Sequence, residues 1–156
     1  MELIRLDRGW ELALREFLLS LTRGGDDAFF QPHAADVEAI RKIIADRRKD
    51  EYLLLVDGGE VYGYGLLRGW DEGYEIPSLG LAIHASVRGA GFGRAFMHYL
   101  HATAKHRGAK KIRLRVHKNN AQAIRLYRSL GYALEQDGDQ PTYLIGFKSL
   151  AKAGVS

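Results

Sequence analysis

The sequence predicts an α/β domain with a mixed β-sheet, and two observations support this prediction. Segments in which apolar and polar residues alternate are typical of strands, and they are interspersed with segments that have the apolar spacing of helices. Turns that contain glycine separate many of these segments. The resulting order is β-α-α-β-β-β-α-β-α-β-β, and the length of 156 residues fits one domain, residues 1–156.

The first half of the chain contains strong hairpin and helix signals. Trp10, Leu14 and Leu21 share one face of a predicted helix, as apolar residues do in an amphipathic helix. Asp57-Gly58-Gly59-Glu60 separates two strands and favours a hairpin, because glycine adopts positive φ at little cost. The elements expected here are strand 2–6, helix 10–21, helix 34–48, and strands 52–56 and 61–67.

The second half alternates strands with helices. A strand at Glu75–His84 is interrupted by Pro77 and Gly80, which suggests an edge or a bulge. Asn119 or Asn120 is expected to cap the last helix. The further elements expected here are helix 91–107, strand 111–117, a helix that ends at 130, a short strand 132–135 and a last strand 140–147.

Composition excludes several classes of function. The chain has no cysteine, so disulfides, cysteine-based zinc sites and a cysteine nucleophile are excluded. The N-terminal residues lack the apolar segment of a signal peptide, and the longest aliphatic run, Leu53–Val56, is too short to span a bilayer. We therefore expect a cytoplasmic protein with no membrane partner.

The charge is distributed unevenly. Arg88–Leu134 holds eleven Lys or Arg and no Asp or Glu, whereas the rest of the chain has 12 basic and 19 acidic residues. This asymmetry favours a polyanionic partner, which is a nucleic acid, a phosphorylated cofactor or an anionic surface. A solvated basic surface is the alternative.

Between a predicted strand and a predicted helix lies the glycine loop, Arg88-Gly89-Ala90-Gly91-Phe92-Gly93-Arg94. Backbone N–H groups at a helix start are unpaired and carry partial positive charge, and glycine lets an anion approach them closely. The loop suits a pyrophosphate, with Arg88 and Arg94 nearby. It lacks the Gly-Lys-Ser/Thr of a P-loop and the spacing of a dinucleotide fingerprint. A tight turn without a ligand is the alternative.

Two motifs in this region resemble signatures of the GNAT superfamily of N-acetyltransferases. One is Arg/Gln-x-x-Gly-x-Gly/Ala at a strand-to-helix turn, which Arg88, Gly91 and Gly93 match. The other is Leu-x-Val-x-x-x-Asn-x-x-Ala-x-x-Leu-Tyr-x-x-x-Gly-Phe/Tyr, matched without a gap by Leu114, Val116, Asn120, Ala123, Leu126, Tyr127, Gly131 and Tyr132. The resemblance covers nearly the whole chain. It implies the GNAT-like fold, in which the central parallel strands splay apart.

The resemblance implies acetyl-CoA as cosubstrate and assigns its binding residues. The glycine loop would bind the pyrophosphate through Arg88, Gly89, Ala90, Gly91, Phe92, Gly93 and Arg94. The backbone of Leu81, Ala82 and Ile83 would pair with pantetheine, and Asn120, Ala123 and Tyr127 would contact the cofactor from the next helix. Tyr127 resembles the family's usual general acid, which protonates the departing thiolate; a buried aromatic is the alternative.

Without cysteine, we expect direct attack of the neutral amine in a ternary complex. Glu75 and His84 are the candidates for the base that takes the ammonium proton: Glu75 by resemblance to some protein-acetylating members, and His84 because histidine is a common general base at neutral pH. His98 and His101 are spaced like a metal pair, but no third ligand is evident, so no metal site is predicted.

The resemblance places the acceptor amine at residues 23–35, 70–75 and 136–142. These segments hold Asp26, Asp27, Phe29, Asp71 and other acidic or aromatic residues. They favour a cationic small-molecule amine, and faint similarities point to an amino sugar. Solvated acidic loops are the alternative. A protein N-acetyltransferase, a nucleic-acid-binding module and a CoA sensor stay open, although no nucleic acid is expected. A homodimer is left open by the family resemblance.

Overall fold

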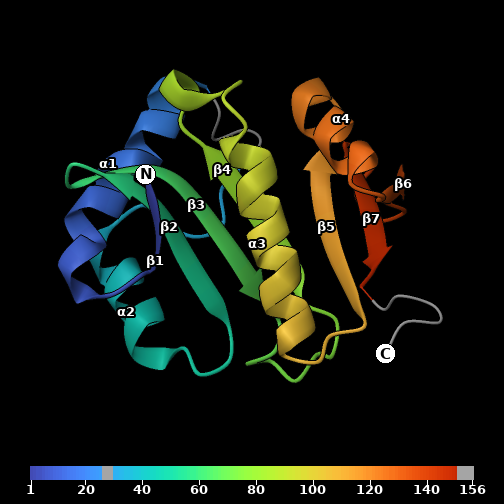
Figure 1. Ribbon diagram of the computed structural model, residues 1–156, viewed down its shortest axis with the longest axis horizontal. Coiled ribbons are helices and arrows are strands. Elements are labelled where there is room, and N and C mark those ends of the chain that lie inside the picture. The colour runs from blue at the N-terminus through green and yellow to red at the C-terminus, as the bar shows by residue number, and fades with distance from the viewer. Residues whose placement is uncertain (26–29, 151–156) are drawn as a thin grey trace.

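Figure 1 shows the computed structural model, which describes residues 1–25 and 30–150. The described residues form seven strands and four α-helices in the predicted order. The strands are β1 (Glu2–Arg5), β2 (Glu51–Asp57), β3 (Glu60–Arg68), β4 (Ser78–Ile83), β5 (Lys111–His117), β6 (Ala133–Gln136) and β7 (Tyr143–Ser149). The helices are α1 (Glu11–Arg23), α2 (Val37–Asp46), α3 (Phe92–His106) and α4 (Ala121–Ser129).

The seven strands form one mixed sheet in the order β1-β2-β3-β4-β5-β7-β6. Neighbouring strands are antiparallel except β4 and β5, which run parallel. The predicted α/β fold with a parallel pair at its centre is therefore confirmed. No helix of the described residues is both long and apolar enough to cross a bilayer.

Helices cover both faces of the sheet, and β2 illustrates why. Leu53 and Leu55 pack in the core under α3 and α4, whereas Leu54 and Val56 pack in the core under α1 and α2. Because both faces are covered, β2 is a continuous apolar run and does not alternate. Burying one such leucine contributes about 1.5–3 kcal/mol.

Helix α3 approaches the sheet most closely at Gly65 of β3. A Cβ at this position would lie 2.4 Å from the Phe96 ring, so only glycine fits. Figure 1 shows α3 crossing beside β4 and β5, with α4 next to β5. This close packing fixes the start of α3, and with it the glycine loop, at the end of β4.

Several predicted boundaries differ from the structure, and two of these differences have a clear physical reason. The strand expected at Glu75–His84 is β4, Ser78–Ile83, because Pro77 lacks an N–H and the preceding turns have positive φ at Gly69 and Gly73. The helix expected at 34–48 is α2, which starts only after Asp36. The Asp36 carboxylate accepts a hydrogen bond of 2.8 Å from the Ala39 N–H and caps the helix.

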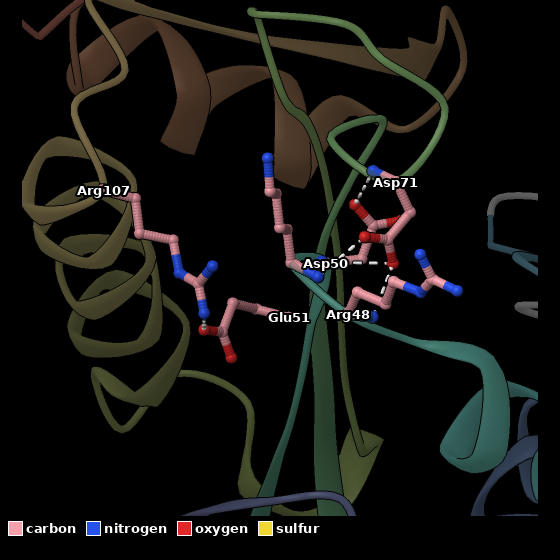
Figure 2. A network of polar contacts seen from close by, with 6 residues as sticks. Arg48, Asp50, Glu51, Asp71 and Arg107 are labelled. Atoms are coloured by element: carbon pink, nitrogen blue, oxygen red, sulfur yellow. Dashed lines mark hydrogen bonds and ion pairs between the residues drawn. The ribbon is translucent and has the colours of Figure 1, made fainter.

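A polar network anchors the loop before β4 (Figure 2). The Asp71 carboxylate accepts hydrogen bonds from the backbone N–H groups of Arg48, Lys49 and Asp50, and the Asp50 carboxylate accepts one from the Asp71 N–H. Desolvation acts to raise the pKa of Asp71, but the three backbone hydrogen bonds outweigh it and the pKa is lowered. The network ties this loop to the start of β2.

Candidate active site

Strands β4 and β5 separate soon after they meet. They pair only at Ser78–Arg113 and Leu79–Leu114, whereas β5 stays paired with β7 from Lys111 to His117. The remaining part of β4 borders a cavity of about 410 Å³ between the two strands. The predicted splay is confirmed, and it opens the sheet for a ligand.

The edge of β4 that faces the cavity has no strand partner beyond Leu79. The Arg113 N–H donates to the Pro77 carbonyl on the β5 side, and the His84 N–H donates to the Tyr62 carbonyl on the β3 side. Because backbone direction alternates along a strand, the N–H groups of Leu81 and Ile83 point into the cavity and that of Ala82 points to β3. The N–H and carbonyl of Leu81 and the N–H of Ile83 can therefore pair with an extended ligand, whereas the Ile83 carbonyl accepts a hydrogen bond from Arg88.

The glycine loop forms one end of the cavity. Gly89 and Gly91 have φ of 81° and 91°, a backbone conformation that L side chains rarely adopt. Gly91 directly precedes α3 and leaves its first turn without a side-chain cap. The N–H groups at the start of α3 therefore remain available to an anion.

Most of the predicted loop residues line the cavity. Gly89, Gly91 and Gly93 do so, together with the two arginines at either end of the loop. Arg88 donates from Nε to the Ile83 carbonyl at 3.0 Å, and Arg94 donates from Nη2 to the Ser129 hydroxyl at 2.9 Å. Ala90 and Phe92 belong to the loop but are not among the lining residues.

Helix α4 supplies the opposite wall. Asn120 caps it, and the Asn120 Oδ1 accepts a hydrogen bond of 3.3 Å from the Ala123 N–H. Asn120, Ala123 and Tyr127 all line the cavity. Tyr127 is otherwise buried, and burial raises its pKa to about 12. No hydrogen bond joins its hydroxyl to another group of residues 1–25 and 30–150. Tyr127 therefore keeps its proton at neutral pH and can donate it to a ligand.

The two predicted bases lie outside the cavity lining. Glu75 is exposed in the loop before β4, whereas the glycine loop follows the far end of that strand. His84 lies at that far end, where its Nδ1 accepts a hydrogen bond of 3.1 Å from the Ser86 N–H. Its ring packs near Phe17 and Tyr62. The structure does not bring Glu75 and His84 together.

A second cavity, of about 530 Å³, adjoins the first near the point where β4 and β5 meet. Both cavities are lined by Phe30, Leu79, Gly80 and Arg115. The second is lined in addition by Gln31, Pro32, Leu66, Arg68, Ser78, Arg113 and Tyr143. We call it the arginine pocket.

The arginine pocket differs from the acidic acceptor region expected from the sequence. Asp26, Asp27 and Phe29 lie outside the described residues, and Asp71 is held by the backbone N–H groups of residues 48–50. Segments 70–75 and 136–142 supply none of the described lining residues. Arg113 was missed, although strand alternation puts it on the face opposite the buried Ile112 and Leu114.

The histidine pair has a packing role. His101 is buried, and its Nε2 lies 2.7 Å from the Tyr132 hydroxyl oxygen. Burial, together with the charges of Lys148 and His98, lowers the pKa of His101 to about 4. Among the described residues, no three His, Cys, Asp or Glu side chains gather as metal ligands would.

Comparisons with known proteins identify the family of this chain. The model of the acetyltransferase (GNAT) family matches residues 10–132. A mycothiol acetyltransferase from Streptomyces coelicolor is 39% identical over 82 residues, which cover 53% of this chain and 25% of that protein. The chain thus spans about a quarter of the length of this relative.

Solved structures share the fold. A putative acetyltransferase from Salmonella typhimurium, solved with its cofactor acetyl-CoA, has a TM-score of 0.77 at 20% identity, covering 100% of this chain and 97% of its own. A ribosomal-protein-alanine N-acetyltransferase from Brucella melitensis has a TM-score of 0.76 at 20% identity, and the match covers 96% of this chain and 99% of that one. This chain belongs to the GNAT acetyltransferase family.

Proposed function

We propose that the protein transfers the acetyl group of acetyl-CoA to the amino group of a small molecule, by direct attack in a ternary complex. The observation that carries this proposal is the junction of the two cavities at Leu79 and Gly80. One cavity leads from the glycine loop past Tyr127, and the other offers about 530 Å³, a size that suits a small molecule. An amino sugar is one acceptor of this size.

The residues of the first cavity fit acetyl-CoA. The unpaired N–H groups after Gly91 suit a pyrophosphate, and Arg88 and Arg94 add positive charge at the same end. Leu81 offers its N–H and C=O, and Ile83 its N–H, to an extended amide chain. The Leu81 N–H lies closest to the junction of the cavities, and we assign it to polarise the thioester carbonyl.

Tyr127 is proposed as the general acid. The amine nitrogen forms a bond to the acetyl carbon, the carbon–sulfur bond breaks, and the thiolate takes a proton from the Tyr127 hydroxyl. The nitrogen loses one proton to solvent, and Tyr127 regains one from solvent. The raised pKa of Tyr127 supports this role, because the hydroxyl enters each cycle protonated.

The base stays open between Glu75 and His84. Both lie outside the cavity lining, so either would act only through intervening water. The substitutions Glu75→Gln and His84→Gln distinguish the two candidate bases. The variant that lacks the true base should lose turnover most strongly at pH values below the pKa of the acceptor amine. If neither substitution changes the pH profile, the amine loses its proton directly to solvent water.

The decisive experiment is to incubate the protein with acetyl-CoA and a panel of small amines and to follow the release of coenzyme A thiol. We expect turnover that saturates in both substrates, and acetylated amine in equal amount. Acetyl-CoA binding without thiol release from any amine would favour a CoA sensor. Acetylation of peptides alone would favour a protein N-acetyltransferase. Binding of DNA that acetyl-CoA does not displace would favour a nucleic-acid module.

A further inference from the structure

The arginine pocket is lined by three arginines, Arg68, Arg113 and Arg115, on one face of the sheet. Arg68 of β3 pairs with Ser78 of β4, and Ser78 pairs with Arg113 of β5. Residues paired across neighbouring strands point to the same face, so Arg68, Ser78 and Arg113 form a row across the sheet. Arg115 lies two residues beyond Arg113 on the same face. All four residues line the pocket.

Neutral groups orient two of the arginines. Arg68 donates a hydrogen bond of 2.9 Å from Nη1 to the Pro32 carbonyl. The Arg115 guanidinium lies 4.3 Å from the centre of the Tyr143 ring, as in a cation–π contact. Both contacts are with uncharged partners, so neither contact neutralises the charge of its guanidinium group.

Acidic residues are absent from the described lining of this pocket. Leu79, Gly80 and the other described lining residues include no Asp or Glu. Within residues 1–25 and 30–150, no carboxylate forms an ion pair with Arg68, Arg113 or Arg115. Like charges held close together repel, and an anion placed among them is stabilised by each. Guanidinium groups bind the paired oxygens of carboxylate and phosphate particularly well.

Resting on the function proposed above, we propose that the arginine pocket binds an oxyanion of the acceptor. Arg68, Arg113 and Arg115 would thereby select amines that also carry a carboxylate or a phosphate. This inference replaces the cationic acceptor expected from the sequence.

The geometry also specifies the spacing within such an acceptor. The amine must reach the junction of the cavities at Gly80, and the row of arginines crosses β4 at Ser78. Two residues of a strand span about 7 Å. An acceptor whose oxyanion lies several bonds from its amine therefore fits this spacing.

The same charges favour the reactive form of the amine. A bound ammonium beside Arg113 and Arg115 is disfavoured relative to the neutral amine, which lowers the pKa of the bound amino group. The pocket therefore orients the acceptor by its anion and helps to deprotonate its nucleophile.

Matched pairs of acceptors test the proposal. Glucosamine 6-phosphate against glucosamine isolates the phosphate, and 6-aminohexanoate against hexylamine isolates the carboxylate. We expect the anionic member of at least one pair to have a kcat/KM at least tenfold higher, and the pair that responds identifies the oxyanion. If thiol is released but both members of each pair react equally, the oxyanion proposal is overturned while the proposed function stands.

Variants locate the effect. Arg113→Gln and Arg68→Gln should each lower kcat/KM for the preferred anionic acceptor about 10–100-fold, in line with the loss of a charge-assisted hydrogen bond. They should leave the KM for acetyl-CoA within about twofold. Lys111→Gln is the control, because Lys111 lies on the same strand and face as Arg113 but outside the pocket. If Lys111→Gln lowers kcat/KM by the same factor, general surface charge explains the effect and the pocket does not.

A binding measurement tests the pocket without turnover. Glucosamine 6-phosphate and 6-aminohexanoate are titrated into the protein saturated with coenzyme A, so that the glycine loop is already filled. The Nε–Hε resonances of the arginines are followed by NMR. Shifts of the Arg68 and Arg113 signals with either probe support the proposal, and their invariance with both refutes it even if no tested amine is acetylated.

Discussion

Replacing Tyr127 with phenylalanine removes one hydroxyl and little else. The remaining ring keeps its contact with Tyr132, whose ring centre lies 5.9 Å away. The hydroxyl makes no hydrogen bond to the described protein, so its loss should change the free energy of unfolding by less than about 0.5 kcal/mol. Any large effect on the rate therefore reports on catalysis.

The expected effect on the rate follows from the role of the hydroxyl. General acid catalysis contributes about 10²–10⁴-fold, so Tyr127→Phe should lower kcat by about 100-fold or more, or about 2.7 kcal/mol. The KM for acetyl-CoA should stay within about twofold, because the loop and the β4 edge are untouched. Stopped assays of thiol release over a range of acetyl-CoA concentrations measure both quantities.

Tyr132→Phe is the matched control. Tyr132 is also buried, but its hydroxyl contacts His101 at 2.7 Å and it is not among the residues that line the cavity. This variant should keep its kcat and lose about 1–3 kcal/mol of stability, because a buried hydrogen bond is removed. A Tyr127→Phe enzyme that turns over at the wild-type rate would refute the assignment of Tyr127 as general acid.

Two further perturbations follow from the structure. Gly91→Ala and Gly108→Ala both force alanine to a φ of 91° in open space, so each should cost about 1–2 kcal/mol of stability. Only Gly91→Ala should weaken coenzyme A binding in a calorimetric titration, and equal affinities would exclude the glycine loop as the phosphate site. The pKa of Asp71 is lowered in the folded protein, so its carboxylate contributes stability above its unfolded pKa of about 3.9 that is lost as pH falls through the folded value. Asp71→Ala should therefore destabilise the protein by about 1 kcal/mol at pH 7 and less at pH 2 in urea unfolding, and a constant difference would contradict this.

The sequence predicted the features that depend on neighbouring residues. The glycine loop, the cap at Asn120 and the hairpin at residues 57–60 have local signals, because φ and backbone hydrogen bonds there depend on a few adjacent side chains. The start of β4 was placed too early, since apolar periodicity does not show how far a turn before Pro77 extends. Boundaries of this kind depend on tertiary packing.

The arginine pocket was not predicted from the sequence, for a physical reason. Arg68 and Arg113 are distant in the sequence and become neighbours only because β4 pairs with both of their strands. Asp71 has the residue type of an acceptor site, but its hydrogen bonds go to a turn. Neither fact is contained in a local pattern, so the positive charge of this pocket becomes evident only from the sheet register.

A crystal structure with coenzyme A bound tests the central claim most directly. It should show the pyrophosphate on the N–H groups that follow Gly91, pantetheine paired with Leu81 and Ile83, and the sulfur within about 4 Å of the Tyr127 hydroxyl. Coenzyme A bound elsewhere, or a sulfur on the opposite side of the sheet from Tyr127, would contradict the account.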